Sequence, residues 1–372
     1  MRRRHKRLRK VEKDGKGLSM TWVLLVIAFI LIFIGLIFVF EASSIRALNA
    51  TGDSFHFLKL QLRWILFGSV VLGFFSWYNY KNLYFLSIPA MIGVVILLIV
   101  VLIPGIGHTA GGARSWIDLG FINVQPTEFT KFAIILYLAS WFSKKEKNRF
   151  LPFMLLIGLL LLLIMMQPDM GTAIMVFSLA IAMYFLAGQD LRYLLAMAPI
   201  AVIGFVGLIF TAPYRLKRLT AFLNPENDPL GVGFHINQIL ISVTEGGLFG
   251  RGFGASRQKY LFLPEAHTDS IFAIISEELG FVGSFLIIVL YFVFLYKIYQ
   301  LYNSVDDRFG KLLIGGIFTY FGLQIIINLG GMVNIMPLTG VTLPFISYGG
   351  SSMLASCMLL GIAINVARQT KT

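Results

Sequence analysis

A single acidic side chain, Asp269, stands where a polar segment of the chain meets a long apolar run. It ends the stretch Leu-Pro-Glu-Ala-His-Thr-Asp at 263–269, and residues 270–299 are almost wholly apolar. Arg, Lys and His residues precede it in the same polar segment. A carboxylate at the edge of lipid, beside cations, can accept a proton from a substrate that arrives on a lipid carrier. The alternative interpretation is that Asp269 only caps the helix that begins there.

Two more carboxylates follow within the apolar run. Glu277 and Glu278 lie two helical turns beyond Asp269, about 12 to 13 Å along the axis. Carboxylates in an apolar span are costly unless they face a cavity or a partner. By helical angle, Glu277 lies closer to the face of Asp269, and Glu278 points to the opposite side. We expect one of them to line a polar cavity, with Glu277 as the candidate, and the other to pair with a neighbouring helix.

Two Gln-Pro dipeptides each precede an apolar helix. Pro126 and Pro168 suit a first turn, because the N–H that proline lacks would be unpaired there anyway. Glu128 and Lys131 then share a helix face, so they either form an intrahelical ion pair or line a polar cavity. Asp169 falls in the first turn of the second helix, where the helix dipole favours a carboxylate. Capping and a shared polar vestibule both explain Asp169.

The polar segment 212–268 brings many cations to one place. It opens with Pro-Tyr-Arg-Leu-Lys-Arg at 213–218, and its end carries Arg251, Arg257 and Lys259. Arg side chains bind phosphate oxygens through two parallel hydrogen bonds, so a lipid pyrophosphate is a fitting ligand; a solvated surface is the alternative. A short amphipathic or re-entrant helix fits 233–244. The candidate substrate-binding residues are Arg114, Glu128, Lys131, Asp169, Arg215, Arg218, Gln238, Lys259, His267, Glu277 and Ser347.

The composition sets the class of protein that must position these residues. The chain is 57% hydrophobic and only 13% charged, whereas soluble domains are about 25% charged, and its mean hydropathy is +0.80. These values exclude a soluble globule and predict an all-α polytopic membrane protein. A helix needs about 20 apolar residues to cross a bilayer. Ten transmembrane helices are predicted near 20–42, 61–78, 83–103, 127–142, 150–166, 172–188, 191–211, 270–299, 311–330 and 351–367.

Basic residues orient these helices. Nine of the 31 Lys and Arg fall in the first sixteen residues, and four more cluster at Lys144, Lys145, Lys147 and Arg149; both groups are predicted to be cytoplasmic. The domain prediction is a basic cytoplasmic tail at 1–19, one ten-helix membrane domain at 20–367 and a cytoplasmic tail at 368–372. The predicted outer loops are 43–60, 104–126, 212–268 and 331–350, with 212–268 between the seventh and eighth helices.

The formal net charge of +13 is explained by this topology and by attraction to anionic lipid. Nucleic-acid binding needs aromatic or groove-reading elements among the basic residues. The basic leader has none, so no nucleic-acid partner is expected.

Six segments of the chain form a recognisable set: Gly111–Trp116, Gln125–Lys131, Gln167–Thr172, Pro213–Arg218, Arg257–Gly280 and Thr342–Ser352. Together they resemble the SEDS family (shape, elongation, division, sporulation), which includes the RodA, FtsW and SpoVE proteins of bacterial cell-wall synthesis. The resemblance covers about residues 20 to 367. The Pro-Tyr-Arg-Leu-Lys-Arg, Asn-Pro and Arg-Gln-Lys-Tyr segments look closer to the division and sporulation branch, FtsW and SpoVE.

The resemblance implies a peptidoglycan glycosyltransferase in the bacterial cytoplasmic membrane that polymerises lipid II on the outer side. It also implies a class B penicillin-binding transpeptidase as partner, with other cell-wall or divisome proteins. The family's catalytic acid, in its His-Thr-Asp segment, corresponds to Asp269. The next residue, Ser270, departs from the Phe of many members, which leaves the acid intact.

The expected reaction uses Asp269 to remove the proton from the 4-hydroxyl of an N-acetylglucosamine. Attack on C1 of the lipid-linked glycan strand then inverts it to a β-1,4 bond and releases undecaprenyl pyrophosphate. Arg114, Arg215, Arg218 and Lys259 are expected to stabilise the leaving pyrophosphate, with Ser347 at the opposite rim. A divalent cation, Mg²⁺ or Mn²⁺, is expected to be held by Asp269 and substrate phosphates, since no metal-ligand spacing is visible.

Two other functions are possible for such a chain. A transporter could move lipid II across the membrane, and a non-catalytic scaffold could hold the transpeptidase. A carrier that rocks between two halves should show related repeats and a midplane site. The polar groups here crowd the outer side instead, which favours the enzyme.

Overall fold

The computed structural model describes most of the chain. Gly111, Lys145 and Lys147, named above, lie outside the described residues. The described ranges are 2–110, 113–118, 120, 122–144, 149–210, 213–228, 231–260 and 262–370.

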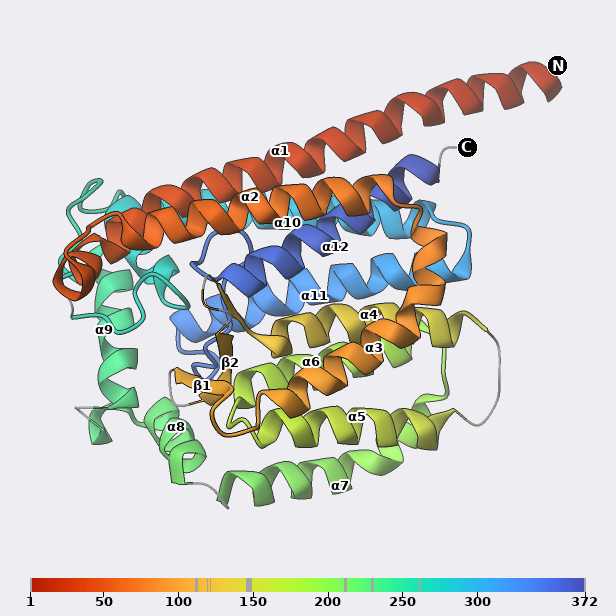
Figure 1. Ribbon diagram of the computed structural model, residues 1–372. Helices are drawn as coiled ribbons and strands as arrows, with labels where there is room; N and C mark the ends of the chain where they lie inside the picture. Colours follow the sequence, from red (N-terminus) through yellow and green to blue (C-terminus); the bar gives the residue numbers. More distant parts are fainter. Residues whose placement is uncertain are drawn as a thin grey trace.

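Long helices run side by side and make up the body of the molecule (Figure 1). Each predicted apolar run coincides with one of them. Six of the described helices, namely α1, α2, α3, α10, α11 and α12, are long and apolar enough to cross a membrane. The chain is therefore a mostly helical, polytopic membrane protein. The long helices are α1 (Arg2–Thr51), α2 (His56–Trp77), α3 (Leu83–Val100), α4 (Pro126–Ser143), α5 (Phe150–Met165), α6 (Met170–Leu186), α7 (Leu191–Phe210), α10 (Ile271–Ser304), α11 (Arg308–Met332) and α12 (Gly350–Gln369).

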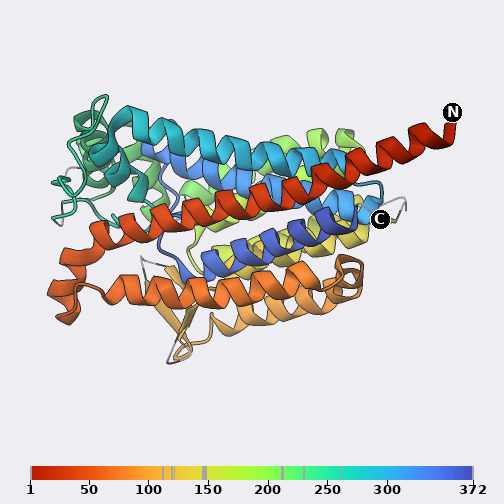
Figure 2. The ribbon, with the colours of Figure 1, turned by 90° about the horizontal axis from the view of Figure 1, so that it is seen from above.

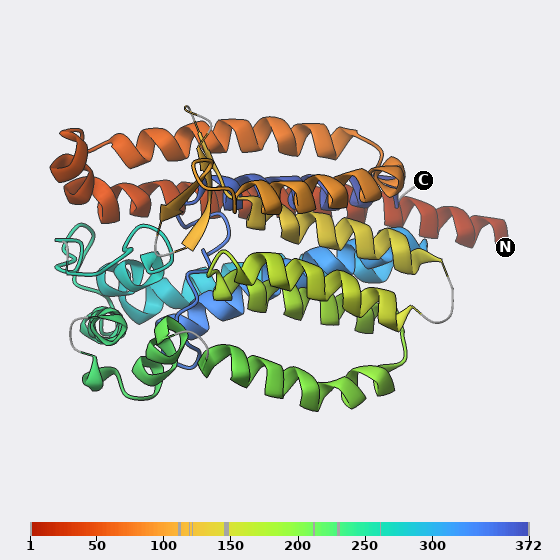
Figure 3. The same cartoon turned by 60° about the horizontal axis from the view of Figure 1, so that its bottom comes forward.

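Helix α12 lies inside the bundle and packs along α2 (Figure 2). In its most apolar stretch 89% of the residues are buried, against 17% in α2. Small residues allow the close approach, because a Cβ on Gly361 would lie 2.7 Å from the Leu72 carbonyl oxygen. Such contacts are typical of helices that pack in membranes. Across the bundle, α2 and α7 lie at opposite edges (Figure 3).

The two ends of the bundle differ. Helix α1 begins and α12 ends at one end, whereas the helices of the 212–268 segment lie at the other, here called the loop end (Figure 1). These helices are α8 (Pro213–Leu223) and α9 (Val232–Glu245), with a 3₁₀ turn, η2 (Pro225–Asn227), between them; a second such turn, η1 (Tyr80–Asn82), precedes α3. The helix predicted over 233–244 is confirmed by α9.

A small antiparallel sheet also lies at the loop end. It consists of β1 (Gly107–Ala110), β2 (Ala113–Asp118) and β3 (Asn123–Val124), in the order β1-β2-β3. The prediction of an all-α chain is corrected here. The strands of this sheet are short and lie in a glycine-rich segment, so the sequence shows no clear alternating pattern that would have predicted them.

Helix α10 is broken near its start, at Gly280, which has φ 66° and ψ −166°. The backbone groups around the break bond to the glycine-rich segment 247–252: Phe281 N–H donates to the Gly247 carbonyl (2.8 Å), and Arg251 N–H donates to that of Glu277 (3.0 Å). A Cβ on Gly280 would lie 2.2 Å from Gly250 N. The predicted span 270–299 therefore begins with a short helical segment, 271–279, held in place by the loop.

Candidate active site

Asp269 lies at the loop end, just before α10. The N-cap of that helix is Ser270, whose side chain makes no capping bond. Asp269 is partly exposed as a residue, and its carboxylate instead accepts a hydrogen bond from Thr268 Oγ1 at 3.1 Å. Capping therefore does not explain Asp269, and its carboxylate is available for chemistry.

A second carboxylate, Glu265, lies on the same turn. Thr268 Oγ1 is 3.0 Å from Glu265 Oε2 and 3.1 Å from Asp269 Oδ1, so one hydroxyl lies between the two acids. Burial and the negative charge of Glu265 raise the pKa of Asp269 from its ordinary value of 3.8 to about 6, against the opposing effects of Thr268 and Arg218. A base with a pKa near the working pH suits proton transfer. The sequence analysis did not select Glu265, although its spacing of four residues from Asp269 was visible.

The turn that carries the acid is fixed by its backbone. Thr268 N–H and Ser270 N–H both donate to the Glu265 carbonyl, at 3.1 and 3.3 Å. On the other side, Tyr348 N–H donates to the His267 carbonyl at 2.9 Å. Next to Tyr348, the buried hydroxyl of Ser347 accepts a bond from Leu343 N–H at 2.8 Å. The predicted rim residue Ser347 thus shapes the segment that binds the acid's turn.

His267 is buried beneath this turn. Its ring lies 4.5 Å from that of Phe57, between centroids. Burial, followed by the charge of Arg46, lowers the pKa of His267 to about 4, so the imidazole is neutral at neutral pH. A cavity of about 300 Å³ adjoins it, between α1 and the loop. The cavity is lined by Ala42, Arg46, Lys259, Leu263, Pro264, Glu265, Ala266 and His267.

Helices α8 and α9 bring further polar groups to Asp269. The charge of Arg218, on α8, acts on both Asp269 and His235. His235, on α9, has its Nε2 2.7 Å from Ser270 Oγ. Burial, with a further contribution from Arg218, lowers the pKa of His235 to about 4 despite the nearby Glu265. The sequence analysis missed His235, because its partner lies 35 residues further along.

The two carboxylates of α10 both bind the preceding loop. Glu277 accepts bonds from Ser256 Oγ (2.6 Å) and Arg257 N–H (2.9 Å). Glu278 accepts bonds from Gly254 N–H (3.0 Å) and Ser256 N–H (3.3 Å). Both glutamates are buried. The expected division of roles is therefore not seen: Glu277 holds the loop, as Glu278 does.

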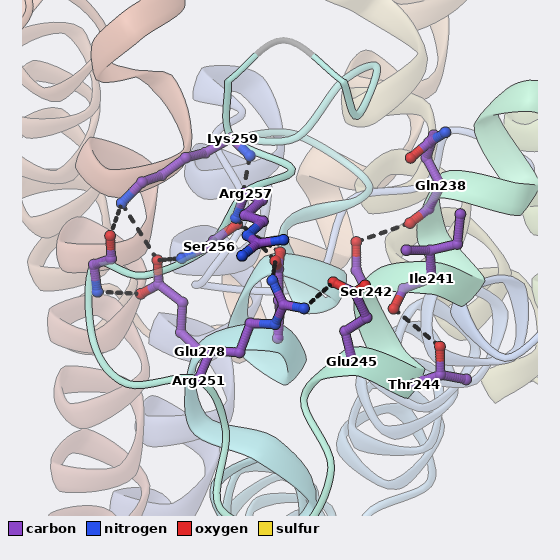
Figure 4. Close-up of polar contacts among 12 residues, drawn as sticks. Gln238, Ile241, Ser242, Thr244, Glu245, Arg251, Ser256, Arg257, Lys259 and Glu278 are labelled. Atoms are coloured by element: carbon purple, nitrogen blue, oxygen red, sulfur yellow. Dashed lines mark hydrogen bonds and ion pairs between the residues drawn. The ribbon is translucent and has the colours of Figure 1, made fainter.

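Lys259 completes this anchor. Its Nζ lies 2.7 Å from Glu41 Oε2 on α1. It also lies 3.5 Å from Glu278 Oε1, a residue drawn with Lys259 in Figure 4. Arg251 adds an ion pair with Glu245 at 2.6 Å (Figure 4). Lys259 was predicted to bind substrate. In the structure its ammonium group lies in a tether between α1, the loop and α10, and the residue also lines the cavity beside His267.

Glu128 and Lys131 form a buried ion pair within α4, with 2.7 Å between Oε1 and Nζ. Lys131 Nζ also lies 5.6 Å from the centre of the Tyr320 ring on α11. Glu128 Oε2 has no hydrogen-bond partner among the described residues. The intrahelical pair is observed, and it lies between packed helices.

The remaining candidates occupy different elements. Asp169 is the N-cap of α6, where it accepts bonds from the N–H (3.0 Å) and hydroxyl (2.7 Å) of Thr172; the first turn predicted for it begins one residue later. Arg215, on α8, is buried and donates to the Tyr214 hydroxyl at 2.9 Å. Arg114 is half-buried on β2, and Gln238 is half-buried on α9. The structure thus brings Arg218 and His267 to the turn of Asp269, and gives Asp169, Lys259 and Glu277 structural contacts.

The described residues hold no group of three or more His, Cys, Asp or Glu side chains that could enclose a metal ion. Asp269 and Glu265 nevertheless place two carboxylates beside one hydroxyl. Mg²⁺ is commonly held by one or two carboxylates together with substrate phosphates. The residues present therefore fit a divalent cation that binds with its substrate.

Comparison with known proteins gives a consistent result. A family model named for FtsW, RodA and SpoVE, and described as a cell cycle protein, matches residues 21–372. The stage V sporulation protein E of Bacillus subtilis is 42% identical over 362 residues, which cover 96% of this chain and 99% of that protein. A probable peptidoglycan glycosyltransferase FtsW of Geobacter sp. is 37% identical over 355 residues, which cover 94% and 97% of the two chains.

Solved structures agree with the fold. One chain from a peptidoglycan synthase complex, described as coordinating polymerization and crosslinking, superposes with a TM-score of 0.78 at 26% identity, over 94% of this chain and 98% of that one. The Rod shape determining protein RodA of Thermus thermophilus gives 0.69 at 26% identity, over 94% and 96%.

Proposed function

The chain belongs to the FtsW/RodA/SpoVE family of cell cycle proteins, and from that premise we propose that it is a peptidoglycan glycosyltransferase that polymerises lipid II. The resemblance in sequence is thereby confirmed at the level of the family. The observation that carries the proposal is Asp269, a partly exposed carboxyl whose pKa is raised to about 6 at the end of a membrane helix. A base of this kind is what deprotonation of a sugar hydroxyl requires.

We propose that all ten long helices cross the bacterial cytoplasmic membrane, with both ends of the chain on the cytoplasmic side. Two observations support this topology. The start of α1 and the end of α12 lie at the same end of the bundle (Figure 1), and the basic leader favours the cytoplasm. The loop end then faces outwards, where Asp269 meets substrates at the membrane surface.

In the proposed reaction, Asp269 takes the proton of the 4-hydroxyl of an N-acetylglucosamine in lipid II. The O4–C1 bond forms as the C1–O bond to pyrophosphate breaks, with inversion to a β-1,4 linkage. Undecaprenyl pyrophosphate then leaves with the electron pair. Arg218, which already acts on the Asp269 carboxylate, is the described cation best placed to stabilise the leaving phosphate, and Arg215 lies on the same helix.

A divalent cation, Mg²⁺ or Mn²⁺, held by Asp269 with substrate phosphates, would supply positive charge to the leaving group. Glu265 is the second carboxylate that fits such an ion. His267 and His235, both neutral at neutral pH, add no charge and help to exclude water from the turn.

We further propose a class B penicillin-binding transpeptidase as the partner, within a larger group of cell-wall or divisome proteins. The support is the similarity to a chain of a peptidoglycan synthase complex that coordinates polymerization with crosslinking. A polymerase and a crosslinking enzyme act in turn on the same strand, so their association is functionally sensible.

The test uses the protein with its cognate transpeptidase in vesicles, with fluorescent lipid II and Mg²⁺. We expect a ladder of glycan polymers that lysozyme digests. Transbilayer movement of labelled lipid II without any polymer would overturn the proposal in favour of a transporter. If neither polymer nor movement of lipid II is seen, a scaffold is left as the function, and the proposed glycosyltransferase activity is likewise overturned.

A further inference from the structure

Asn328, on α11, holds the backbone of the acid. Its Nδ2 donates to the carbonyl of Asp269 and to that of Val341, both at 2.8 Å. The side chain is 3% exposed, and its Oδ1 has no hydrogen-bond partner among the described residues. The amide NH₂ therefore makes the specific contacts, and the two carbonyl acceptors fix its orientation.

The two carbonyls belong to two segments of the chain that meet beside the Asp269 carboxylate. One is that of Asp269 itself, and the other follows Gly340, where a Cβ would lie 3.9 Å from Asp269 Oδ2. One side chain thus joins the backbone of the acid to the segment that lies beside its carboxylate. Buried carbonyls need such partners, because an unpaired one loses the hydrogen bonds that water gives it in the unfolded chain.

Asn328 acts together with a second contact. Tyr348 N–H binds the carbonyl of His267, two residues before Asp269. The turn is therefore held at two points by segments that lie more than fifty residues further along the chain. With the backbone of the turn held at these two points, the position of the Asp269 carboxylate depends chiefly on rotation of its own side chain.

We propose that Asn328 is a positioning residue for Asp269, which keeps the carboxylate aligned with the sugar hydroxyl. This inference rests on the proposed role of Asp269 as the base. Displacement of a catalytic group by about 1 Å can cost a factor of about 10² in rate. Loss of Asn328 should therefore reduce kcat and leave lipid II binding nearly unchanged.

The chain offers a matched control in Asn365, on α12. It too is 3% exposed and binds backbone through its amide, with Nδ2 donating to Ser76 O (2.8 Å) and Oδ1 accepting from Tyr80 N–H (2.9 Å). Its contacts lie at the end of the bundle opposite Asp269. Asn365→Ala should lower thermal stability without changing kcat per folded molecule.

The experiment compares Asn328→Ala, Asn328→Ser, Asn328→Asp and Asn365→Ala in the complex with the transpeptidase. We expect kcat to fall at least about tenfold in Asn328→Ala, with KM for lipid II within about twofold. Asn328→Ser keeps one donor and should lose less. Asn328→Asp places an acceptor against two carbonyl oxygens and should lose more.

A wild-type kcat in Asn328→Ala, with a stability loss equal to that of Asn365→Ala, would overturn the inference. If Asn328→Ala does not fold, Asn328→Ser decides: an unchanged kcat there also overturns it. Asp269→Asn is measured alongside. Activity in Asp269→Asn would refute the proposed base, whereas an inactive Asp269→Asn with a fully active Asn328→Ser refutes only the positioning role.

Discussion

Lys259 Nζ lies 2.7 Å from Glu41 Oε2, which joins the loop before the acid to α1, 218 positions earlier in the chain. Lys259 also lies 3.5 Å from the buried Glu278. Since the loop leads directly into the turn of Asp269, this contact ties the position of the acid to the first helix. Loss of the tether is therefore expected to lower the stability of the fold more than it weakens substrate binding.

Lys259→Met should lower the free energy of unfolding by about 3 kcal/mol, because it leaves a buried carboxylate without its cation. Thermal unfolding, with proteolysis of the 250–262 loop as a second measure, tests this. The control is Lys59→Met, because Lys59 pairs with Asp53 at 2.7 Å on the surface and should cost less than about 1 kcal/mol. A stable Lys259→Met with a raised KM would instead show that Lys259 binds substrate.

The buried pair of Glu128 and Lys131 allows a double-mutant test. Either Glu128→Gln or Lys131→Met alone should destabilise the protein by about 3 to 5 kcal/mol, since it leaves the other group unpaired. The double variant should recover most of the loss. Thermal unfolding measures this, and lipid II polymerisation by the double variant shows whether the pair has a second role. Equal losses in all three variants would contradict an ion pair whose main effect is mutual neutralisation.

Gly280 is predicted to tolerate no side chain. Gly280→Ala should destabilise the protein by about 2 kcal/mol or more, because φ is +66° and a Cβ would meet the backbone of Gly250. Gly73→Ala is the control: Gly73 lies in α2 with open space around its Cβ position, so alanine should be neutral or stabilise by up to about 1 kcal/mol. If Gly280→Ala and Gly73→Ala lower the unfolding temperature by the same amount, the break in α10 is not required for stability.

The pKa of Asp269 predicts how stability depends on pH. Folding raises this pKa from 3.8 to about 6, so the folded state binds the proton more tightly than the unfolded one. The resulting stabilisation is complete below pH 3.8 and is lost as pH rises through 6. Relative to Asp269→Asn, the wild type should therefore lose unfolding temperature between pH 4 and about 6.5, measured in chelator. A constant difference between the two proteins would contradict the raised pKa.

Activity should also depend on the ionisation of Asp269, but it should rise with pH where the stability falls. Asp269 can act as a base only when it is ionised. The value of kcat/KM should therefore rise with pH, and the midpoint of the rise should lie near pH 6. Glu265→Gln removes the negative charge that helps to raise this pKa and should move the midpoint to lower pH. A midpoint that stays in place in Glu265→Gln would show that Glu265 does not tune the acid.

Local signals in the sequence predicted local features of the structure. Pro126 marked the start of α4, and the amphipathic stretch 233–244 predicted α9. The tertiary partners were not predictable in the same way. Glu277 and Glu278 were correctly seen as carboxylates that need partners, but a helical angle cannot reveal that the partners are loop N–H groups some twenty residues earlier.

The residues that the sequence analysis missed share one property. His235 and Asn328 act on the turn of Asp269 through Ser270 Oγ and a backbone carbonyl, so their roles depend on which distant segments meet. A residue type alone does not show which distant backbone or side-chain group it will bind. Glu265 is the exception, since its place on the same turn could have been inferred from spacing.

The most direct test of the account compares lipid II polymerisation by the wild type and by Asp269→Asn, each bound to the transpeptidase. Asparagine keeps the size of the side chain and cannot accept the proton. We predict that the polymerisation rate falls by a factor of about 10² to 10⁴, while binding of lipid II is retained and thermal stability at neutral pH is no lower than that of the wild type. Polymerisation by Asp269→Asn at the wild-type rate would contradict the assignment of Asp269 as the base.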